Sequence, residues 1–137
     1  PKDADLLYAF GKNLGIAFQI QDDILDTYGD IKVFGKATGG DIVTNKKTFL
    51  LVKAMELASA RTRRKLQDLA EQKEIDPAEK IRSVMEIYDQ LKVKSVTESI
   101  ANDYISTAFG KLDKVSVNKK RKGEITLLAE SLIGREK

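Results

Sequence analysis

Apolar residues recur every three or four positions over the first 28 residues, and this spacing most constrains how the chain can fold. The residues that share it are Leu6, Leu7, Phe10, Leu14, Ala17, Phe18, Leu25 and Tyr28. Side chains at such intervals lie on one face of an α-helix. We therefore predict a helix that begins near residue 4, with Asp3 as its cap, and ends at Gly29.

The remaining segments also have helical spacing. Further helices are predicted over residues 45–74, with a break near 59–61 as an alternative, and over 76–92, 95–115 and 124–134. Asp76 as N-cap and Pro77 at the first helical position are a strong start signal. A glycine-containing loop is predicted over residues 29–45, and a basic turn over 118–123. Because no segment alternates with period two, we predict an all-α fold in one domain, residues 1–137.

The composition excludes several kinds of chemistry. The chain has 137 residues, 42% of them hydrophobic, and neither cysteine nor histidine. Disulfides, thiolate or imidazole zinc sites, cysteine nucleophiles and histidine-based triads are therefore excluded. The net charge of +3 does not indicate a nucleic-acid partner, and no apolar run is long enough for a membrane span. A cytoplasmic location is the default expectation.

The most unusual segment is FQIQDDILDTYGD, in which Asp22, Asp23, Asp26 and Asp30 lie within nine residues. Like charges four residues apart destabilise a helix by a few tenths of a kcal/mol per pair. Each anion near the C-terminus of a helix destabilises it by roughly 0.3–1 kcal/mol. No lysine or arginine lies three or four residues from the first three aspartates. We therefore predict that a bound cation balances this charge, and oxygen ligands favour Mg²⁺, with Mn²⁺ as an alternative. The competing interpretation is an acidic face exposed to water.

The loop that follows has the features of a phosphate-binding segment. It contains four glycines and the lysines Lys32 and Lys36, and Lys46 and Lys47 follow it. Glycine permits close approach of the backbone to a ligand, and lysine supplies a point charge for phosphate. The segment GKATGGD does not match the P-loop pattern. Together with the aspartates, it predicts a magnesium–diphosphate site.

Two blocks, LGIAFQIQDDILDTYGD and FGKATGGDIVTNKKTFL, resemble the trans-isoprenyl diphosphate synthases of the polyprenyl synthetase family, of the farnesyl or geranylgeranyl type. They are similar in order and spacing to the family's second aspartate-rich motif and the segment after it. The resemblance implies a helical bundle of the isoprenoid synthase type and a homodimer. It also implies a Mg²⁺-dependent prenyltransferase that condenses isopentenyl diphosphate with an allylic diphosphate and releases pyrophosphate in isoprenoid biosynthesis.

The resemblance also implies roles for individual residues. Asp22 and Asp26 are the expected metal ligands, with Asp23 nearby or acting through water. The residues expected at the substrate diphosphate are Gln19, which lines the site, Lys36 and Lys46, which bind the leaving group, and Asp41, which bonds metal-bound water or Lys46. Arg135 and Lys137 are candidates for the isopentenyl phosphate.

The chain departs from the family pattern because it contains one aspartate-rich motif. Family members are longer and place the first such motif, an arginine pair and the residues that set product length upstream. We therefore expect this chain to be the C-terminal portion of a longer synthase, inactive by itself and with uncovered apolar surface. The alternatives are a non-catalytic subunit that modulates a prenyl synthase and a helical interaction domain with an incidental acidic face.

Overall fold

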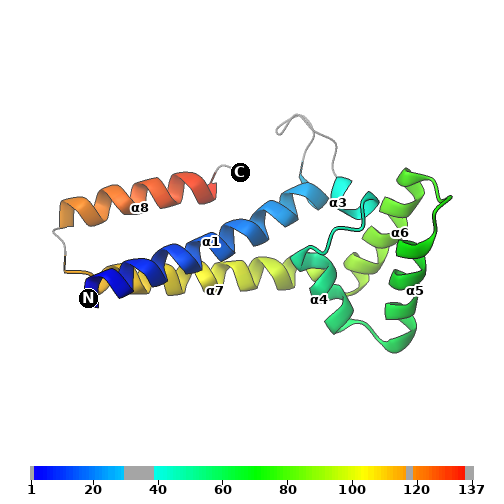
Figure 1. Ribbon diagram of the computed structural model, residues 1–137, viewed down its shortest axis with the longest axis horizontal. Coiled ribbons are helices and arrows are strands. Elements are labelled where there is room, and N and C mark those ends of the chain that lie inside the picture. The colour runs from blue at the N-terminus through cyan, green and yellow to red at the C-terminus, as the bar shows by residue number, and fades with distance from the viewer. Residues whose placement is uncertain (1, 30–38, 117–118, 135–137) are drawn as a thin grey trace. The chain divides into compact units, whose positions relative to one another are not determined.

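A computed structural model describes residues 2–29, 39–116 and 119–134, and all regular secondary structure in these ranges is helical (Figure 1). The helices are α1 (Lys2–Tyr28), α3 (Gly40–Val43), α4 (Phe49–Leu57), α5 (Ala60–Glu71), α6 (Pro77–Gln90), α7 (Val93–Asp113) and α8 (Lys119–Gly134). The prediction of an all-α fold is confirmed. Asp30, Lys32 and Lys36 of the predicted loop lie outside the described residues.

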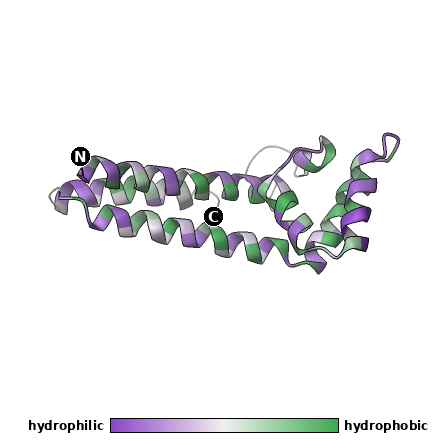
Figure 2. Cartoon of the chain, turned by 60° about the horizontal axis from the view of Figure 1, so that its bottom comes forward, coloured by the Kyte–Doolittle hydropathy of each residue, from purple (hydrophilic) through white to green (hydrophobic). Residues whose placement is uncertain are grey.

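The helices form two compact units, each with its own core. The central unit comprises residues 22–98, and the terminal unit comprises residues 1–21 and 99–137. Helices α1 and α7 contribute to both. Most described helices carry both polar and apolar residues around their axes, as expected for elements that bury one face (Figure 2). None of the helices in the described ranges has the length and apolarity needed to cross a membrane.

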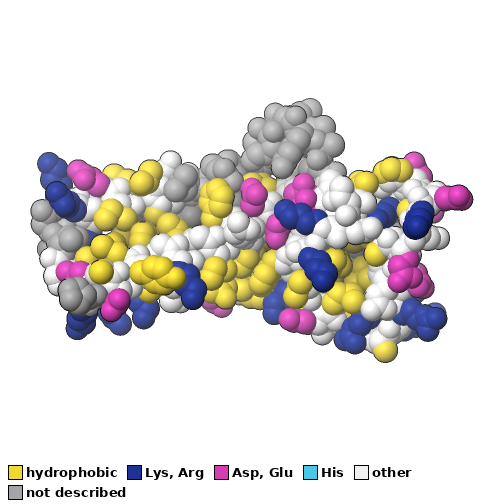
Figure 3. All heavy atoms as spheres, viewed as in Figure 1, with side chains coloured by type: hydrophobic (Ala, Val, Ile, Leu, Met, Phe, Trp, Pro, Cys, Tyr) yellow, Lys and Arg dark blue, Asp and Glu magenta, His cyan; other side chains and the backbone are white. Residues whose placement is uncertain are grey.

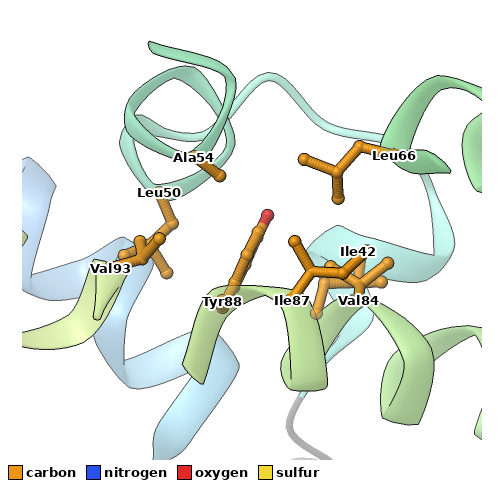
Figure 4. Close-up of a cluster of buried hydrophobic side chains, with 8 residues drawn as sticks. All are labelled: Ile42, Leu50, Ala54, Leu66, Val84, Ile87, Tyr88 and Val93. Atoms are coloured by element: carbon orange, nitrogen blue, oxygen red, sulfur yellow. The ribbon is translucent and has the colours of Figure 1, made fainter. Parts of the chain in front are cut away.

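Tyr88 of α6 lies in the middle of the central unit's core. Figure 4 shows its ring between Leu50 and Ala54 of α4 on one side and Leu66 of α5 on the other. Tyr88 is 2% exposed, and Leu50 is fully buried. The buried residues of this core are Ile42, Leu50, Ala54, Leu66, Val84, Ile87, Tyr88 and Val93. These contacts pack α4, α5 and α6 together with Ile42 of α3, the helix that precedes Lys46 and Lys47.

Three helices of the central unit begin at a capping side chain. The hydroxyl oxygens of Thr48 and Ser59 accept hydrogen bonds from the backbone amides three residues later, at 3.1 and 3.2 Å. The carboxylate of Asp76 accepts one from the Glu79 amide at 3.3 Å, and Pro77 is the first residue of α6. Each cap satisfies an amide that has no partner within the helix. The predicted start of α6 is therefore confirmed, and the predicted break lies between α4 and α5.

The prediction of a helix from residue 45 is wrong at its start. Asn45 has φ of 57°, in the left-handed region, which ends regular helix, and α4 begins only at Phe49. The short helix α3 lies before this turn, inside the segment that was predicted to be a loop.

Two predictions in the terminal unit are also wrong. Asp3 lies within α1 rather than at its cap, and its carboxylate accepts a hydrogen bond from the Ser116 amide at 3.2 Å. The residues from Lys119 to Gly123 are part of α8, not a basic turn. The Nζ of Lys122 donates to the carbonyl of Asp113 at 2.9 Å, which places this cation at the end of α7, where helix carbonyls lack internal partners.

The core of the terminal unit is small and leaves apolar side chains exposed. Phe10 of α1 packs against Phe109 of α7 with ring centroids 6.0 Å apart. Large exposed side chains include Tyr8 at 73%, Leu127 at 68% and Leu128 at 64%. Hydrophobic side chains are also visible on the face drawn in Figure 3. These exposures agree with the expectation of uncovered apolar surface.

Candidate functional site

Two of the predicted aspartates hold the beginnings of the next two helices. The carboxylate of Asp26 accepts a hydrogen bond from the Asp41 amide at 2.9 Å, and the Asp26 carbonyl accepts one from Gly39 at 2.6 Å. The carboxylate of Asp23 accepts a hydrogen bond from the amide of Phe49, the first residue of α4, at 2.9 Å. The C-terminal end of α1 is therefore fastened to α3 and α4, which Figure 1 shows beside it.

These contacts change the explanation of how the acidic charge is tolerated. An amide at a helix N-terminus carries partial positive charge, and a hydrogen bond to a carboxylate is stronger than one between neutral groups. Asp23 and Asp26 obtain compensation from amides 26 and 15 residues away in the sequence. Inspection of positions three and four residues away could not detect such partners. A metal ion is therefore not required to explain the charge of these two side chains.

Asp22 differs from the other two aspartates because its side chain is exposed. It lies one turn before Asp26 on α1, so the two share a helix face. Among the described residues, no group of three or more carboxylates is close enough to hold a metal ion. Magnesium commonly takes only one or two protein carboxylates and completes its shell with water and substrate phosphate oxygens. The chemistry of Asp22 and Asp26 fits such a partial donor set.

The Asp41–Lys46 segment brings an ammonium group to the neighbourhood of these aspartates. The Nζ of Lys46 lies 3.8 Å from the Asp41 carboxylate, one of the two partners expected for Asp41. The backbone amide of Lys46 also donates to the Asp41 carbonyl, at 3.0 Å. The Lys46 side chain is 59% exposed, so the ammonium group is accessible to an anion from solvent. Lys47 is exposed beside it.

Gly39 allows this segment to lie close to α6. Its φ of 87° is left-handed, and a Cβ at this position would lie 2.9 Å from Cδ1 of Ile81. Only glycine tolerates both conditions without strain. The glycines of the sequence were interpreted as ligand-approach positions, but for Gly39 the close neighbour is a helix of the same unit.

The remaining predicted site residues are not brought together by the described structure. Gln19 is exposed on α1 and belongs to the terminal unit. Lys36, Arg135 and Lys137 lie outside the described residues. Their expected roles remain predictions.

Sequence inspection missed a buried lysine near this segment. Lys80 of α6 is 5% exposed and lines a cavity of about 220 Å³ together with Lys46 and Lys47. The sequence does contain a signal for its burial: Val84 and Tyr88 follow Lys80 at intervals of four, which places the lysine on the apolar face of a helix.

Asp23 provides the first test of this arrangement. We expect Asp23→Ala to lower the free energy of unfolding by about 1–2 kcal/mol, because the Phe49 amide loses its acceptor. Asp23→Asn keeps a neutral acceptor and should recover part of that loss. Urea unfolding measured by circular dichroism gives both values. An alanine variant as stable as wild type would contradict the anchoring role.

Tyr28 of α1 has an unusual hydroxyl. It is the one buried side-chain polar atom without a hydrogen-bond partner among the described residues. Burial, with smaller contributions from Asp89 and Glu98, raises the pKa of Tyr28 to about 12. Burial also raises the pKa of Tyr88, with Tyr28 as a further cause.

These shifts predict alkaline destabilisation. The pKa of Tyr28 is about 12 in the folded state, against an ordinary tyrosine value of 10.0 in the unfolded chain. The stability that this group contributes is therefore fully present below the ordinary value and is lost as pH rises from it to the folded-state pKa. Tyr28→Phe should therefore reduce the fall in unfolding free energy between about pH 10 and about pH 12. It should be no less stable at neutral pH, because the hydroxyl lacks a partner. The exposed Tyr8→Phe is the control, and equal pH profiles for the two variants would contradict the prediction.

The described residues form helices, and the aspartate-rich end of α1 contacts the segment from Gly39 to Lys46. Comparison with solved structures shows that this is the fold of the polyprenyl synthetases. The chain superimposes on the crystal structure of a geranylgeranyl pyrophosphate synthase with a TM-score of 0.85 and 32% identity, over 100% of this chain and 43% of that one. A polyprenyl synthetase from Streptomyces coelicolor gives a TM-score of 0.87 at 26% identity, over 97% and 41%. The described helices thus follow the fold of these proteins.

The sequence model of the polyprenyl synthetase family matches residues 1–88, and the chain belongs to this family. It is 35% identical to a geranylgeranyl diphosphate synthase of Sulfolobus acidocaldarius, over 98% of this chain and 41% of that protein. A short chain isoprenyl diphosphate synthase of Methanothermobacter thermautotrophicus is 28% identical, over 99% and 41%. The chain therefore spans about two fifths of the length of these relatives. The resemblance stated from the two sequence blocks is confirmed.

Proposed function

We propose that this chain is part of a Mg²⁺-dependent prenyltransferase that condenses isopentenyl diphosphate with an allylic diphosphate. The observation that carries the proposal is the contact between the aspartate-rich end of α1 and the segment that holds Lys46, made by Asp26 and Asp41. Carboxylates and an exposed ammonium group lie in one unit, as a metal–diphosphate complex requires. Membership of the polyprenyl synthetase family supports the same reaction.

We propose a separate role for each of the aspartates of α1 and for the lysines that follow it. Asp22 and Asp26 supply carboxylate oxygens for Mg²⁺, and Asp23 keeps α4 in place beside them. Bound Mg²⁺ would neutralise the diphosphate charge as the leaving group departs. Lys46 binds the same diphosphate as a point charge, with Lys36 as a second proposed contact. These positive groups would stabilise the negative charge that develops on the departing pyrophosphate.

The overall reaction breaks the carbon–oxygen bond of the allylic diphosphate and forms a carbon–carbon bond to the isopentenyl double bond. The proton lost from the isopentenyl unit passes to the departing pyrophosphate, which suits a chain without histidine. We further propose that a second aspartate-rich segment, which these 137 residues lack, completes the metal site from additional polypeptide. A cytoplasmic homodimer is the assembly that the family resemblance implies.

The direct test compares two preparations. Protein expressed from the complete coding region and the 137-residue chain are each incubated with isopentenyl diphosphate, Mg²⁺ and dimethylallyl, geranyl or farnesyl diphosphate. Chromatography of the dephosphorylated products measures chain elongation. We expect product from the first preparation, none with a chelator, and little or none from the second. Absence of product with every allylic substrate would contradict the proposal. Stimulation of an added prenyl synthase would then favour the modulating subunit.

A further inference from the structure

Lys80 of α6 is nearly inaccessible to solvent, with 5% of its surface exposed. Lysine is almost never buried without partners, because removing its charge from water costs several kcal/mol. Its Nζ donates to the Asn45 side-chain oxygen at 2.6 Å and to the Val43 carbonyl at 3.3 Å. The buried ammonium group thus binds the turn that follows α3.

Asn45 is the residue through which this contact acts. It lies in the turn between α3 and α4 and has a left-handed φ of 57°. Its side-chain nitrogen donates to the Ala70 carbonyl of α5 at 3.0 Å. One amide group therefore connects the turn to both α5 and α6, and Lys46 is the next residue in the chain.

The other end of the same turn is fixed independently. The Thr48 amide donates to the Lys46 carbonyl at 2.9 Å, and the Phe49 amide donates to Asp23. Lys46 thus lies between an anchor on α1 and an anchor on α5 and α6. Among the side chains that hold this turn, Lys80 is a charged residue with only 5% of its surface exposed.

We propose that Lys80 is a positioning residue for the diphosphate site: its buried ammonium group holds Asn45 in the left-handed conformation and thereby fixes Lys46. The inference rests on the proposed function, because it assumes that Lys46 binds diphosphate. Lys80 acts through the turn and does not itself contact the ligand. A substitution there should weaken diphosphate binding even though the binding group is unchanged.

The test uses the complete protein and inorganic pyrophosphate with Mg²⁺, measured by calorimetry well below the unfolding temperature. We expect Lys80→Met to raise the dissociation constant about tenfold, because a small displacement of a binding group has a large effect. Arg82→Met removes an exposed cation from the same helix and should leave the constant unchanged. In a Lys46→Met background, Lys80→Met should have no additional effect on binding, because the group that it positions is gone.

Other outcomes distinguish a failure of the positioning role of Lys80 from a failure of the proposed function. If wild type binds pyrophosphate and Lys80→Met binds it equally well, the positioning role is overturned while the proposed function stands. If wild type does not bind pyrophosphate with Mg²⁺, the proposed function and this inference are overturned together. A further loss of affinity on Lys80→Met in the Lys46→Met background would also overturn the positioning role of Lys80. Should Lys80→Met not fold, Asn45→Gly replaces it: glycine can adopt the left-handed conformation but removes the side chain through which Lys80 holds it, so the same loss of affinity is expected.

Discussion

Asp22→Asn in the complete protein is expected to lower the rate of prenyl transfer by about 10²–10³-fold, the effect of removing one group that stabilises developing charge. Asp22 is the exposed aspartate of the three, whereas the carboxylates of Asp23 and Asp26 accept hydrogen bonds from the backbone amides of Phe49 and Asp41. Loss of its charge also removes repulsion with Asp26 worth a few tenths of a kcal/mol.

The control for this variant is Asp103→Asn, which removes the charge of an exposed aspartate on α7. Circular dichroism should show both variants folded, and steady-state rates with saturating Mg²⁺ should separate them. An Asp22→Asn rate within about twofold of wild type would contradict its assignment as a metal ligand.

Leu50→Ala is expected to lower the free energy of unfolding by about 2–5 kcal/mol. Leu50 is fully buried on α4 and packs beside Tyr88 in the central unit's core (Figure 4). The substitution leaves a cavity that neighbouring side chains from two other helices can only partly fill. Because α4 begins at the Phe49 amide held by Asp23, loosening this helix should also weaken the anchor.

The matched control is Val52→Ala on the same helix, where the side chain is 45% exposed. Its effect should stay within about 0.5 kcal/mol, as for most surface substitutions. Urea unfolding followed by circular dichroism measures both. Similar effects for the two variants would show that Leu50 does not lie in the stabilising core.

The helical fold was predictable because its signals are local. Apolar spacing located α1, and Asp76 with Pro77 located the start of α6. The turn at Asn45 was missed because its side chain is held by hydrogen bonds with Lys80 and Ala70, which lie 35 and 25 residues away. The basic residues from Lys119 were assigned to a turn on charge alone, although their helix buries apolar residues further along, such as Ala129.

The metal-binding and diphosphate-binding roles assigned to the site residues stay predictions, and only some of the contacts among these residues could be anticipated. The aspartates and Lys46 were identified from motif spacing, and the Asp41–Lys46 ion pair agrees with the expected neighbourhood. The anchoring of Asp23 and Asp26 was not predictable, because a backbone amide leaves no trace in the residue type that carries it. Phe49 and Asp41 act through groups that every non-proline residue has.

The central claim is that the Asp22–Asp26 end of α1 and the Asp41–Lys46 segment together form one part of a magnesium–diphosphate site. Calorimetric titration of the complete protein with inorganic pyrophosphate, with Mg²⁺ and then with a chelator, tests it most directly. The account predicts binding that requires Mg²⁺ and is weakened by Asp22→Asn and by Lys46→Met. Binding of equal strength in the presence of the chelator, or unchanged by both substitutions, would contradict it.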